Sequence, residues 1–197
     1  MKNLLDDIVE FHTKFGLEGP SALTMPDTNV TTFRINFLLE EQEEICSAVI
    51  REDFPTIADG FVDLVYVGVG TLHLCGWTGS VPVFPTRYFP NYKHGFDLAN
   101  TMLGHLMGEV ESAADTRNGQ TFALAVNQLS QCAVALAELN GIPFLDCWNE
   151  GHRKNMMKER AKRAEDSTRK STLDVIKPPG WTPPDLGAIL RLQGWAG

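Results

Sequence analysis

The sequence predicts an all-α fold, a helical bundle formed by a single domain over residues 1–197. Apolar residues recur three and four positions apart along several long stretches, which is the spacing of one helix face. Proline and glycine gather between these stretches, and the alternation of apolar and polar residues that marks strands is weak throughout. Because 43% of the 197 residues are hydrophobic, the chain can build a substantial core.

Three helices are expected in the N-terminal part of the chain. The first covers about residues 4–15, where Gly16 can end it. The second runs over about residues 32–51, and the third over about residues 55–74, with Pro55 suited to a first helical turn. Valine is frequent in the third stretch, as in strands, but its length and lack of alternation favour a helix.

Four further helices are expected in the C-terminal part. They cover about residues 97–115, 120–140, 143–165 and 182–194. The last of them has a capped start at Thr182-Pro183-Pro184-Asp185. Residues 76–96 are rich in proline, glycine and aromatic residues and predict an irregular arm, whereas residues 167–177 are polar and are expected to be mobile. Residues 167–197 together are expected to form a C-terminal arm.

Charge narrows the classes of partner. The formal net charge is −8, which argues against nucleic-acid binding because proteins that track phosphate backbones carry a basic face. Eight of the 17 basic residues nevertheless lie between Arg153 and Lys170, which indicates one local site for an anion. The acidic N-terminus does not resemble a signal peptide, and Asp63 and His73 interrupt the longest apolar stretch. The four unpaired cysteines fit a reduced core, so we expect a cytoplasmic protein without a membrane partner.

The second expected helix carries a pair of carboxylates. Glu41 and Glu44 stand three residues apart in an E-x-x-E pattern, and such residues share one helix face. Like charges on one face repel each other unless something neutralises them. This pattern alone also fits an ordinary solvated acidic face.

The third expected helix carries a second pair in an apolar setting. Asp59 and Asp63 stand four residues apart, and most of their neighbours are valine, leucine, isoleucine or phenylalanine. A helix that is apolar on nearly all sides is usually buried, and a buried ionised aspartate requires a partner. Asp63 can be paired with Arg34 or Arg51, bonded to Tyr66, or bound to a metal ion.

Two helices that each present paired carboxylates can form an oxygen-lined site between them. Magnesium prefers near-octahedral oxygen ligands and keeps waters and substrate phosphates in its coordination shell. Carboxylate metal sites are found in helical bundles. The sequence contains neither the histidine and cysteine spacings of zinc sites nor the glycine pattern of a P-loop.

At this point the sequence resembles the MazG-like, all-α nucleoside triphosphate pyrophosphohydrolase superfamily, which includes dimeric dUTPases and phosphoribosyl-ATP pyrophosphohydrolase. Four blocks in the family's order carry the resemblance: Leu38-Leu39-Glu40-Glu41-Gln42-Glu43-Glu44, Ile57-Ala58-Asp59-Gly60-Phe61-Val62-Asp63-Leu64-Val65-Tyr66-Val67, His152-Arg153-Lys154-Asn155-Met156-Met157-Lys158 and Lys177-Pro178-Pro179-Gly180-Trp181-Thr182-Pro183. They span roughly residues 1–76 and 142–197.

The resemblance implies specific site residues. Glu41, Glu44 and Asp63 would be the catalytic magnesium ligands, and Asp59 would supply the carboxylate that the family has one position later, where this chain has Gly60. Manganese would be a possible substitute for magnesium. Asn155 and Lys158 match positions that bind the substrate's phosphates or sugar, and Arg153 would assist.

The basic segment supports this assignment independently, because phosphoryl transfer requires cationic groups that meet the developing charge. Lys158 and Arg153 can equally belong to an ordinary solvated helix. The turn Pro179-Gly180-Trp181 is expected to pack the C-terminal arm onto the bundle, with a role in base binding as the alternative.

About 65 residues separate the two halves of the resemblance, and this insert, residues 78–141, can be a degenerate repeat of the first unit. An offset of 68 places Glu109 on Glu41, Ser112 on Glu44, Asn127 on Asp59 and Gln131 on Asp63. Most of the carboxylates would then have become neutral. The alternative is a chance match between amphipathic helices.

These observations favour a magnesium-dependent pyrophosphohydrolase that converts a (d)NTP to the (d)NMP and pyrophosphate, with dUTP as the first expected substrate and dGTP as the second. The resemblance further implies a homo-oligomer, a dimer or a tetramer. Two alternatives remain: hydrolysis of phosphoribosyl-ATP, and a nucleotide-binding helical bundle without catalysis. The loss of the glutamate at Gly60 is the best argument for the second alternative.

Overall fold

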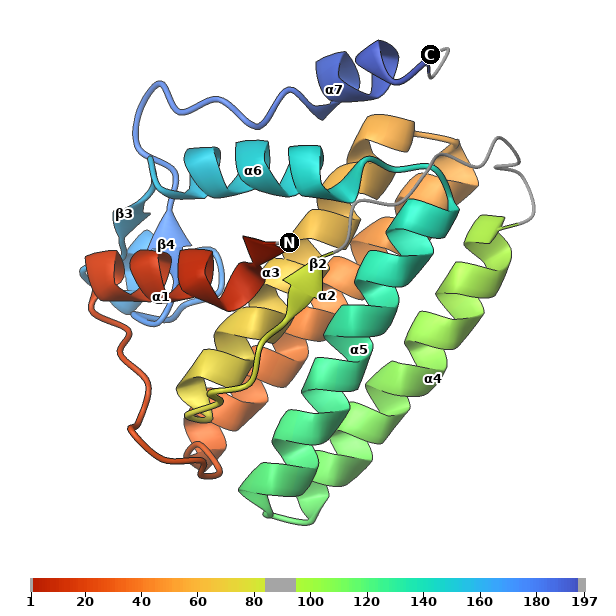
Figure 1. The fold of residues 1–197 in the computed structure, drawn as a ribbon. Helices are drawn as coiled ribbons and strands as arrows, with labels where there is room; N and C mark the ends of the chain where they lie inside the picture. Colours follow the sequence, from red (N-terminus) through yellow and green to blue (C-terminus); the bar gives the residue numbers. More distant parts are fainter. Residues whose placement is uncertain (1, 84–94, 195–197) are drawn as a thin grey trace.

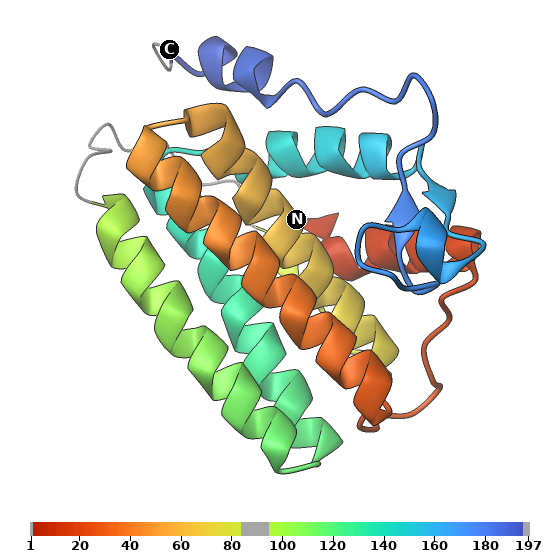
Figure 2. The same cartoon turned by 180° about the vertical axis from the view of Figure 1, so that it is seen from behind.

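A computed structural model describes residues 2–83 and 95–194, and its architecture is an all-α bundle (Figure 1). Its long helices are α2 (Thr28–Arg51), α3 (Phe54–Leu74), α4 (Gly95–Asp115) and α5 (Gly119–Leu139). They form two hairpins, α2–α3 and α4–α5, that lie side by side (Figures 1 and 2). The fold class predicted from the sequence is confirmed.

The shorter helices cover one side of this bundle. Helices α1 (Leu4–Phe15) and α6 (Phe144–Asn155) both pack against α3, and α7 (Leu186–Leu192) contacts α3 and α6 (Figure 1). The strands described in the structure are two residues long. They form the antiparallel pairs β1 (Lys2–Asn3) with β2 (Pro82–Val83) and β3 (Glu159–Arg160) with β4 (Val175–Ile176). Most of the irregular arm expected over residues 76–96 lies outside the described residues.

Local capping explains most helix boundaries. Gly16 ends α1 in a left-handed conformation, with φ of 62°, as its position in the sequence predicted. Helix α2 begins four residues earlier than expected, because the Asp27 carboxylate accepts a hydrogen bond from the Val30 amide and caps the helix. Asp185 caps α7 in the same way, as expected.

Helix α6 ends ten residues earlier than predicted. It stops at Asn155, and the next segment forms β3, a short 3-10 turn at Ala164–Asp166, and β4. Partners from elsewhere take the carbonyls at this helix end: the Trp181 indole donates to the Lys154 carbonyl, and the Lys14 ammonium donates to the Met156 carbonyl. The expectation of a helix through residue 165 is therefore wrong. Residues 167–177, expected to be mobile, contribute a turn and β4.

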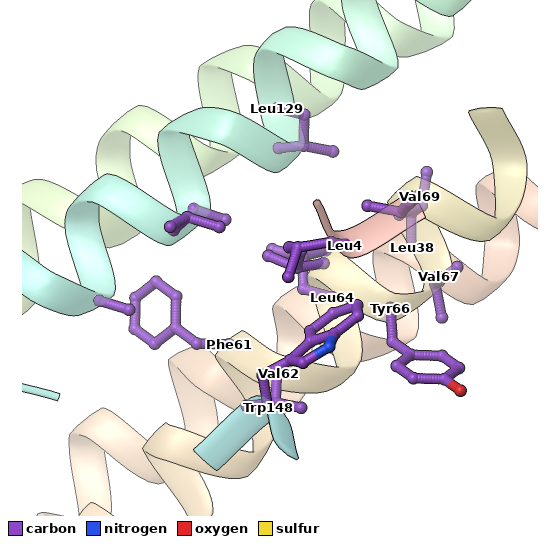
Figure 3. Packing of buried hydrophobic residues seen from close by; sticks show 14 of the residues in the cluster. Leu4, Leu38, Phe61, Val62, Leu64, Tyr66, Val67, Val69, Leu129 and Trp148 are labelled. Carbon is purple, nitrogen blue, oxygen red and sulfur yellow. The ribbon is translucent and has the colours of Figure 1, made fainter. Parts of the chain in front are cut away.

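The core is centred on α3. Fourteen of its residues are buried, and Phe61 and Leu64 lie toward α5, where Leu129 faces them (Figure 3). Trp148 of α6 packs beside Val62 and Tyr66 of α3 (Figure 3). Each large apolar side chain that is fully buried contributes roughly 1.5–3 kcal/mol, so α3 is firmly held.

Helices α3 and α5 are also long and apolar enough to cross a membrane by length and composition alone. In the structure, 78% of the apolar window of α3 and 50% of that of α5 are buried inside the bundle. Core helices of folded domains commonly have this composition. The expected absence of a membrane partner stays a prediction.

The two long hairpins correspond to each other in detail. Asp53 caps α3 by accepting from the Thr56 amide, and Asn118 caps α5 by accepting from the Thr121 amide. Asn118 stands 65 positions after Asp53, and Thr121 stands 65 positions after Thr56. Helix α3 packs against α5, and α2 packs against α4.

The proposed repeat stays a prediction, and the two caps favour an offset of 65 over 68. At 65, Leu124 aligns with Asp59, Gln128 with Asp63, and Leu106 with Glu41. Glu109, which aligns with Glu44, is the one carboxylate among these four positions of α4 and α5. The groove between α4 and α5 therefore lacks most of the acids that α2 and α3 carry.

Candidate functional site

A cleft of about 530 Å³ lies between α2, α3, α1 and the segment that follows α6. Among its lining residues are six that the sequence predicted for a site: Glu41, Glu44, Asp59, Asp63, Asn155 and Lys158. Three parts of the chain, α2, α3 and the end of α6 with the residues after it, therefore bring the predicted groups together. Volumes of this size suit a small organic ligand such as a nucleotide.

Helical spacing aims the four carboxylates at the cleft. Glu41 and Glu44 lie one turn apart on α2, and Asp59 and Asp63 lie one turn apart on α3. The two helices pack against each other, and their apolar faces, with Leu38 and Ile45 on α2, are buried on the other side. Glu41 itself is only 4% exposed.

Close helix packing explains why position 60 is a glycine. A Cβ atom at Gly60 would lie 2.6 Å from Cγ1 of Ile45, so this position faces α2 at a close helix crossing. A glutamate cannot fit there without displacing α2. The neighbouring Asp59 instead points into the cleft, where it can serve as the fourth carboxylate.

The four cleft carboxylates carry more negative charge than nearby cationic side chains neutralise. Burial, followed by the charge of Asp63, raises the pKa of Glu41 to about 9. Burial, Asp63 and Glu44 raise the pKa of Asp59 to about 7. Burial also raises the pKa of Asp63, which forms no salt bridge with Arg34, Arg51 or any other described residue. The group is therefore poised to take up positive charge.

Two lysines border the carboxylates. Lys158 and Lys177 both line the cleft and act to lower the pKa of Asp63. Their ammonium groups lie over the Trp181 ring, at 5.5 and 4.8 Å from its centroid. Trp181 thus packs the C-terminal arm onto α6, as predicted, and also positions both lysines. It does not line the cleft, which argues against direct base binding by Trp181.

Arg169 is a pocket residue that the motifs did not single out. Its guanidinium forms a bidentate pair with Glu40 at 2.8 and 2.9 Å, and it lies 3.5 Å from Glu41 and 3.4 Å from Asp174. It also stacks 3.7 Å from the centroid of the Phe37 ring. Its only sequence signal was its place near the end of the basic segment. Lys177 was visible only as the first residue of the fourth block.

Arg153 is not brought to the site. Its side chain is exposed, and its guanidinium makes two 2.7 Å hydrogen bonds to Glu150, one turn earlier on α6. Arg153 is absent from the lining of the cleft. Arg169, rather than Arg153, is the arginine of the basic segment that reaches the cleft, because α6 ends at Asn155 and the chain then turns back.

Part of the cleft lining is apolar. This part comprises Phe11, Leu17, Phe37, Val67 and Val175, together with two buried polar groups, His12 and Arg34. Burial, helped by Arg34, lowers the pKa of His12 to about 3, so its imidazole is neutral and donates from Nδ1 to the Leu17 carbonyl at 2.9 Å. Arg34 donates to Thr71 and to the Val67 carbonyl.

The donor set fits a hard divalent cation. Carboxylate oxygens are the preferred ligands of magnesium, which also retains waters and phosphate oxygens. Within residues 2–83 and 95–194, the one acidic and histidine group with all ligand atoms within 4.8 Å of one another is Asp7, Glu10 and His152, outside the cleft. The four cleft carboxylates are thus spread more widely than a closed cage, which leaves room for water and phosphate ligands.

The Asp7 group is already used within the protein. The Asp7 carboxylate accepts a hydrogen bond from the Trp148 indole at 2.7 Å and pairs with the Lys2 ammonium at 2.6 Å. A cationic side chain therefore already satisfies this carboxylate.

An all-α bundle with a carboxylate-rich cleft is the class that fold and site define. No protein family model, curated protein or solved structure matches the chain.

Proposed function

We propose that the protein is a magnesium-dependent nucleoside triphosphate pyrophosphohydrolase of the MazG-like type. One observation carries the proposal: paired carboxylates from α2 and α3 share a single cleft with Lys158, Lys177 and Asn155. An acid-rich cleft of this kind repels a triphosphate unless a divalent cation bridges the two. The lysines can then meet charge that the metal leaves on the phosphates.

Each group has a definite task in this proposal. Glu41, Glu44, Asp59 and Asp63 would hold the magnesium ion, which would supply charge neutralisation and activation of a water. Lys158 and Lys177 orient the phosphate chain from the opposite side. The water oxygen attacks the α-phosphorus, the bond to the bridging oxygen of the β-phosphate breaks, pyrophosphate leaves, and one proton is released to solvent.

The apolar part of the lining favours a nucleotide over a simple polyphosphate. Phe11, Val67 and Val175 line the same cleft as the carboxylates and offer apolar contacts to a base. In this binding mode the phosphates would face the carboxylates and lysines, and the base would lie against the apolar side chains. dUTP remains the first candidate substrate and dGTP the second.

A substrate panel tests the proposal. The protein is incubated with magnesium and each of dATP, dGTP, dCTP, dTTP, dUTP and phosphoribosyl-ATP, and the products are separated by anion-exchange chromatography. We expect a nucleoside monophosphate and pyrophosphate in equal amounts from at least one deoxynucleotide. Turnover of phosphoribosyl-ATP alone would support the rival reaction, and nucleotide binding without turnover would support the non-catalytic alternative, for which Gly60 was the argument.

A further inference from the structure

A chain of hydrogen bonds leads from the protein surface to the middle of the cleft. The Glu10 carboxylate lies 3.4 Å from Nε2 of His152, and Nδ1 of His152 lies 2.9 Å from the Tyr66 hydroxyl. Tyr66 in turn receives a side-chain hydrogen bond from Asn155. The chain runs inward from Glu10, whose side chain is 63% exposed, to Tyr66 and Asn155, which are 7% and 6% exposed.

The hydrogen-bond directions in this chain follow from the tautomer of His152 that donates to Glu10. An ionised Glu10 carboxylate only accepts hydrogen bonds, so Nε2 of His152 carries the hydrogen. In a neutral imidazole the other nitrogen, Nδ1, is then an acceptor, and the Tyr66 hydroxyl must donate to it. The Tyr66 oxygen is left as an acceptor, and the Asn155 amide must present its N–H to it.

The rings in this chain are held in place by packing. Phe11 meets the Tyr66 ring edge-on at 5.2 Å, and Trp148 covers another side at 5.1 Å between centroids. Figure 3 shows Tyr66 and Trp148 next to each other beside α3. A tyrosine fixed in this way cannot turn its hydroxyl elsewhere at low cost.

We propose that Glu10, His152 and Tyr66 are positioning residues that fix the direction of the Asn155 amide, so that its oxygen accepts a hydrogen bond from a sugar hydroxyl of the substrate. The proposal rests on the proposed function for the nature of the ligand. Asn155 lines the cleft, so its amide can meet a ligand there.

The contacts of Asn155 favour the sugar over the base or the phosphates. Lys158, three residues later, interacts with the charges of Asp63 and Glu41. Asn155 itself is bonded to Tyr66, which contacts Phe11 of the apolar lining. Asn155 therefore connects the charged and the apolar parts of the lining, as the sugar connects phosphate and base in a nucleotide.

Dideoxynucleotides test the proposal, because they lack only the hydroxyl in question. The values of kcat/KM for the best deoxynucleoside triphosphate of the panel and for its 2′,3′-dideoxy analogue are compared in wild type, Tyr66→Phe and His152→Gln. We expect wild type to prefer the deoxynucleotide by at least about tenfold, the effect of one hydrogen bond. In both variants the preference should fall to about twofold or less. His105→Gln, a histidine change on the exposed face of α4, should keep the full preference.

The alternatives give different results. A purely structural role would lower the melting temperature or kcat for both nucleotides and leave their ratio unchanged, which would overturn the proposal. An equal rate for both nucleotides in wild type would overturn it as well. If no triphosphate is hydrolysed, the proposed function fails. Calorimetric binding of deoxyuridine and dideoxyuridine monophosphates to the same variants then tests Asn155 on its own.

Discussion

Gly60 determines which side chain completes the carboxylate set. Its Cα faces Ile45 of α2 so closely that no larger side chain fits, and the acid of this turn is therefore found at Asp59. If Asp59 is a metal ligand, Asp59→Ala should raise the magnesium concentration for half-maximal activity about as much as Glu44→Ala. Magnesium titrations of both variants check this. Unchanged magnesium dependence in Asp59→Ala would leave Asp59 as a solvated residue.

The raised pKa values make stability depend on pH. The pKa of Glu41 in the folded protein is about 9, whereas an unperturbed glutamate has a pKa of ~4.3. The folded state therefore binds a proton at Glu41 more tightly than the unfolded state does. The resulting contribution to the free energy of unfolding is fully present below about pH 4 and is lost as the pH rises toward 9. In EDTA, the melting temperature of wild type should fall between about pH 5 and 9.

Glu41→Gln removes that titration, so its melting temperature should fall less over the same range. Magnesium should offset the loss in wild type, because the ion binds the ionised carboxylates. Thermal denaturation followed by circular dichroism measures both effects. Parallel plots of melting temperature against pH for wild type and Glu41→Gln would show that burial and neighbouring charge do not raise the pKa of Glu41.

At the scale of elements, the segment from β3 to β4 closes one wall of the cleft through Arg169. Its pairs with Glu40 and Asp174 and its stacking on Phe37 are partly exposed, so together they contribute only about 1–2 kcal/mol. In Arg169→Gln, the amides of residues 159–176 should exchange about 5–30-fold faster. Hydrogen–deuterium exchange measures this, and Arg163→Gln, whose partner Asp166 is local, is the control. Unchanged exchange in Arg169→Gln would show that Arg169 does not hold this segment against the cleft.

The α4–α5 hairpin is expected to supply packing rather than chemistry. Leu106 and Leu136 are 7% and 6% exposed, and truncating either to alanine should destabilise the protein by ~2–5 kcal/mol. Turnover per folded molecule should hardly change. Glu109 is exposed and pairs with His105 at 3.3 Å, so Glu109→Gln should leave both stability and rate near wild type. A rate loss in Glu109→Gln at saturating magnesium would place a second active site on this hairpin.

The whole molecule shows which features a sequence can predict. Helical periodicity predicted the long helices, because a helix of 21 to 24 residues with one buried face leaves a strong pattern of apolar residues. The ends of α2 and α6 were misplaced, because they depend on the Asp27 cap and on contacts from Trp181 and Lys14 across the chain. Such long-range partners leave no periodic signal.

In the site, too, local spacing could be predicted from the sequence and long-range contacts could not. Glu41, Glu44, Asp59 and Asp63 could be predicted because helical spacing alone places each pair on one face. Arg169 could not, since a chain reversal after Asn155 brings it to α2 from 129 positions away along the chain. Arg153 was chosen in its place because it lies in the motif, but α6 turns it toward Glu150.

The central claim is that the shared cleft of α2 and α3 uses magnesium to release pyrophosphate. Asp63, at the centre of the carboxylates, is the most direct probe, and Asp63→Asn keeps the size of the side chain while removing its charge. The decisive measurement is the rate of pyrophosphate release from the best deoxynucleotide, as magnesium is titrated into wild type and Asp63→Asn. We expect no release in EDTA, saturable release in wild type, and at least about a hundredfold lower release in Asp63→Asn with unchanged helicity. Full activity in EDTA or in Asp63→Asn would contradict it.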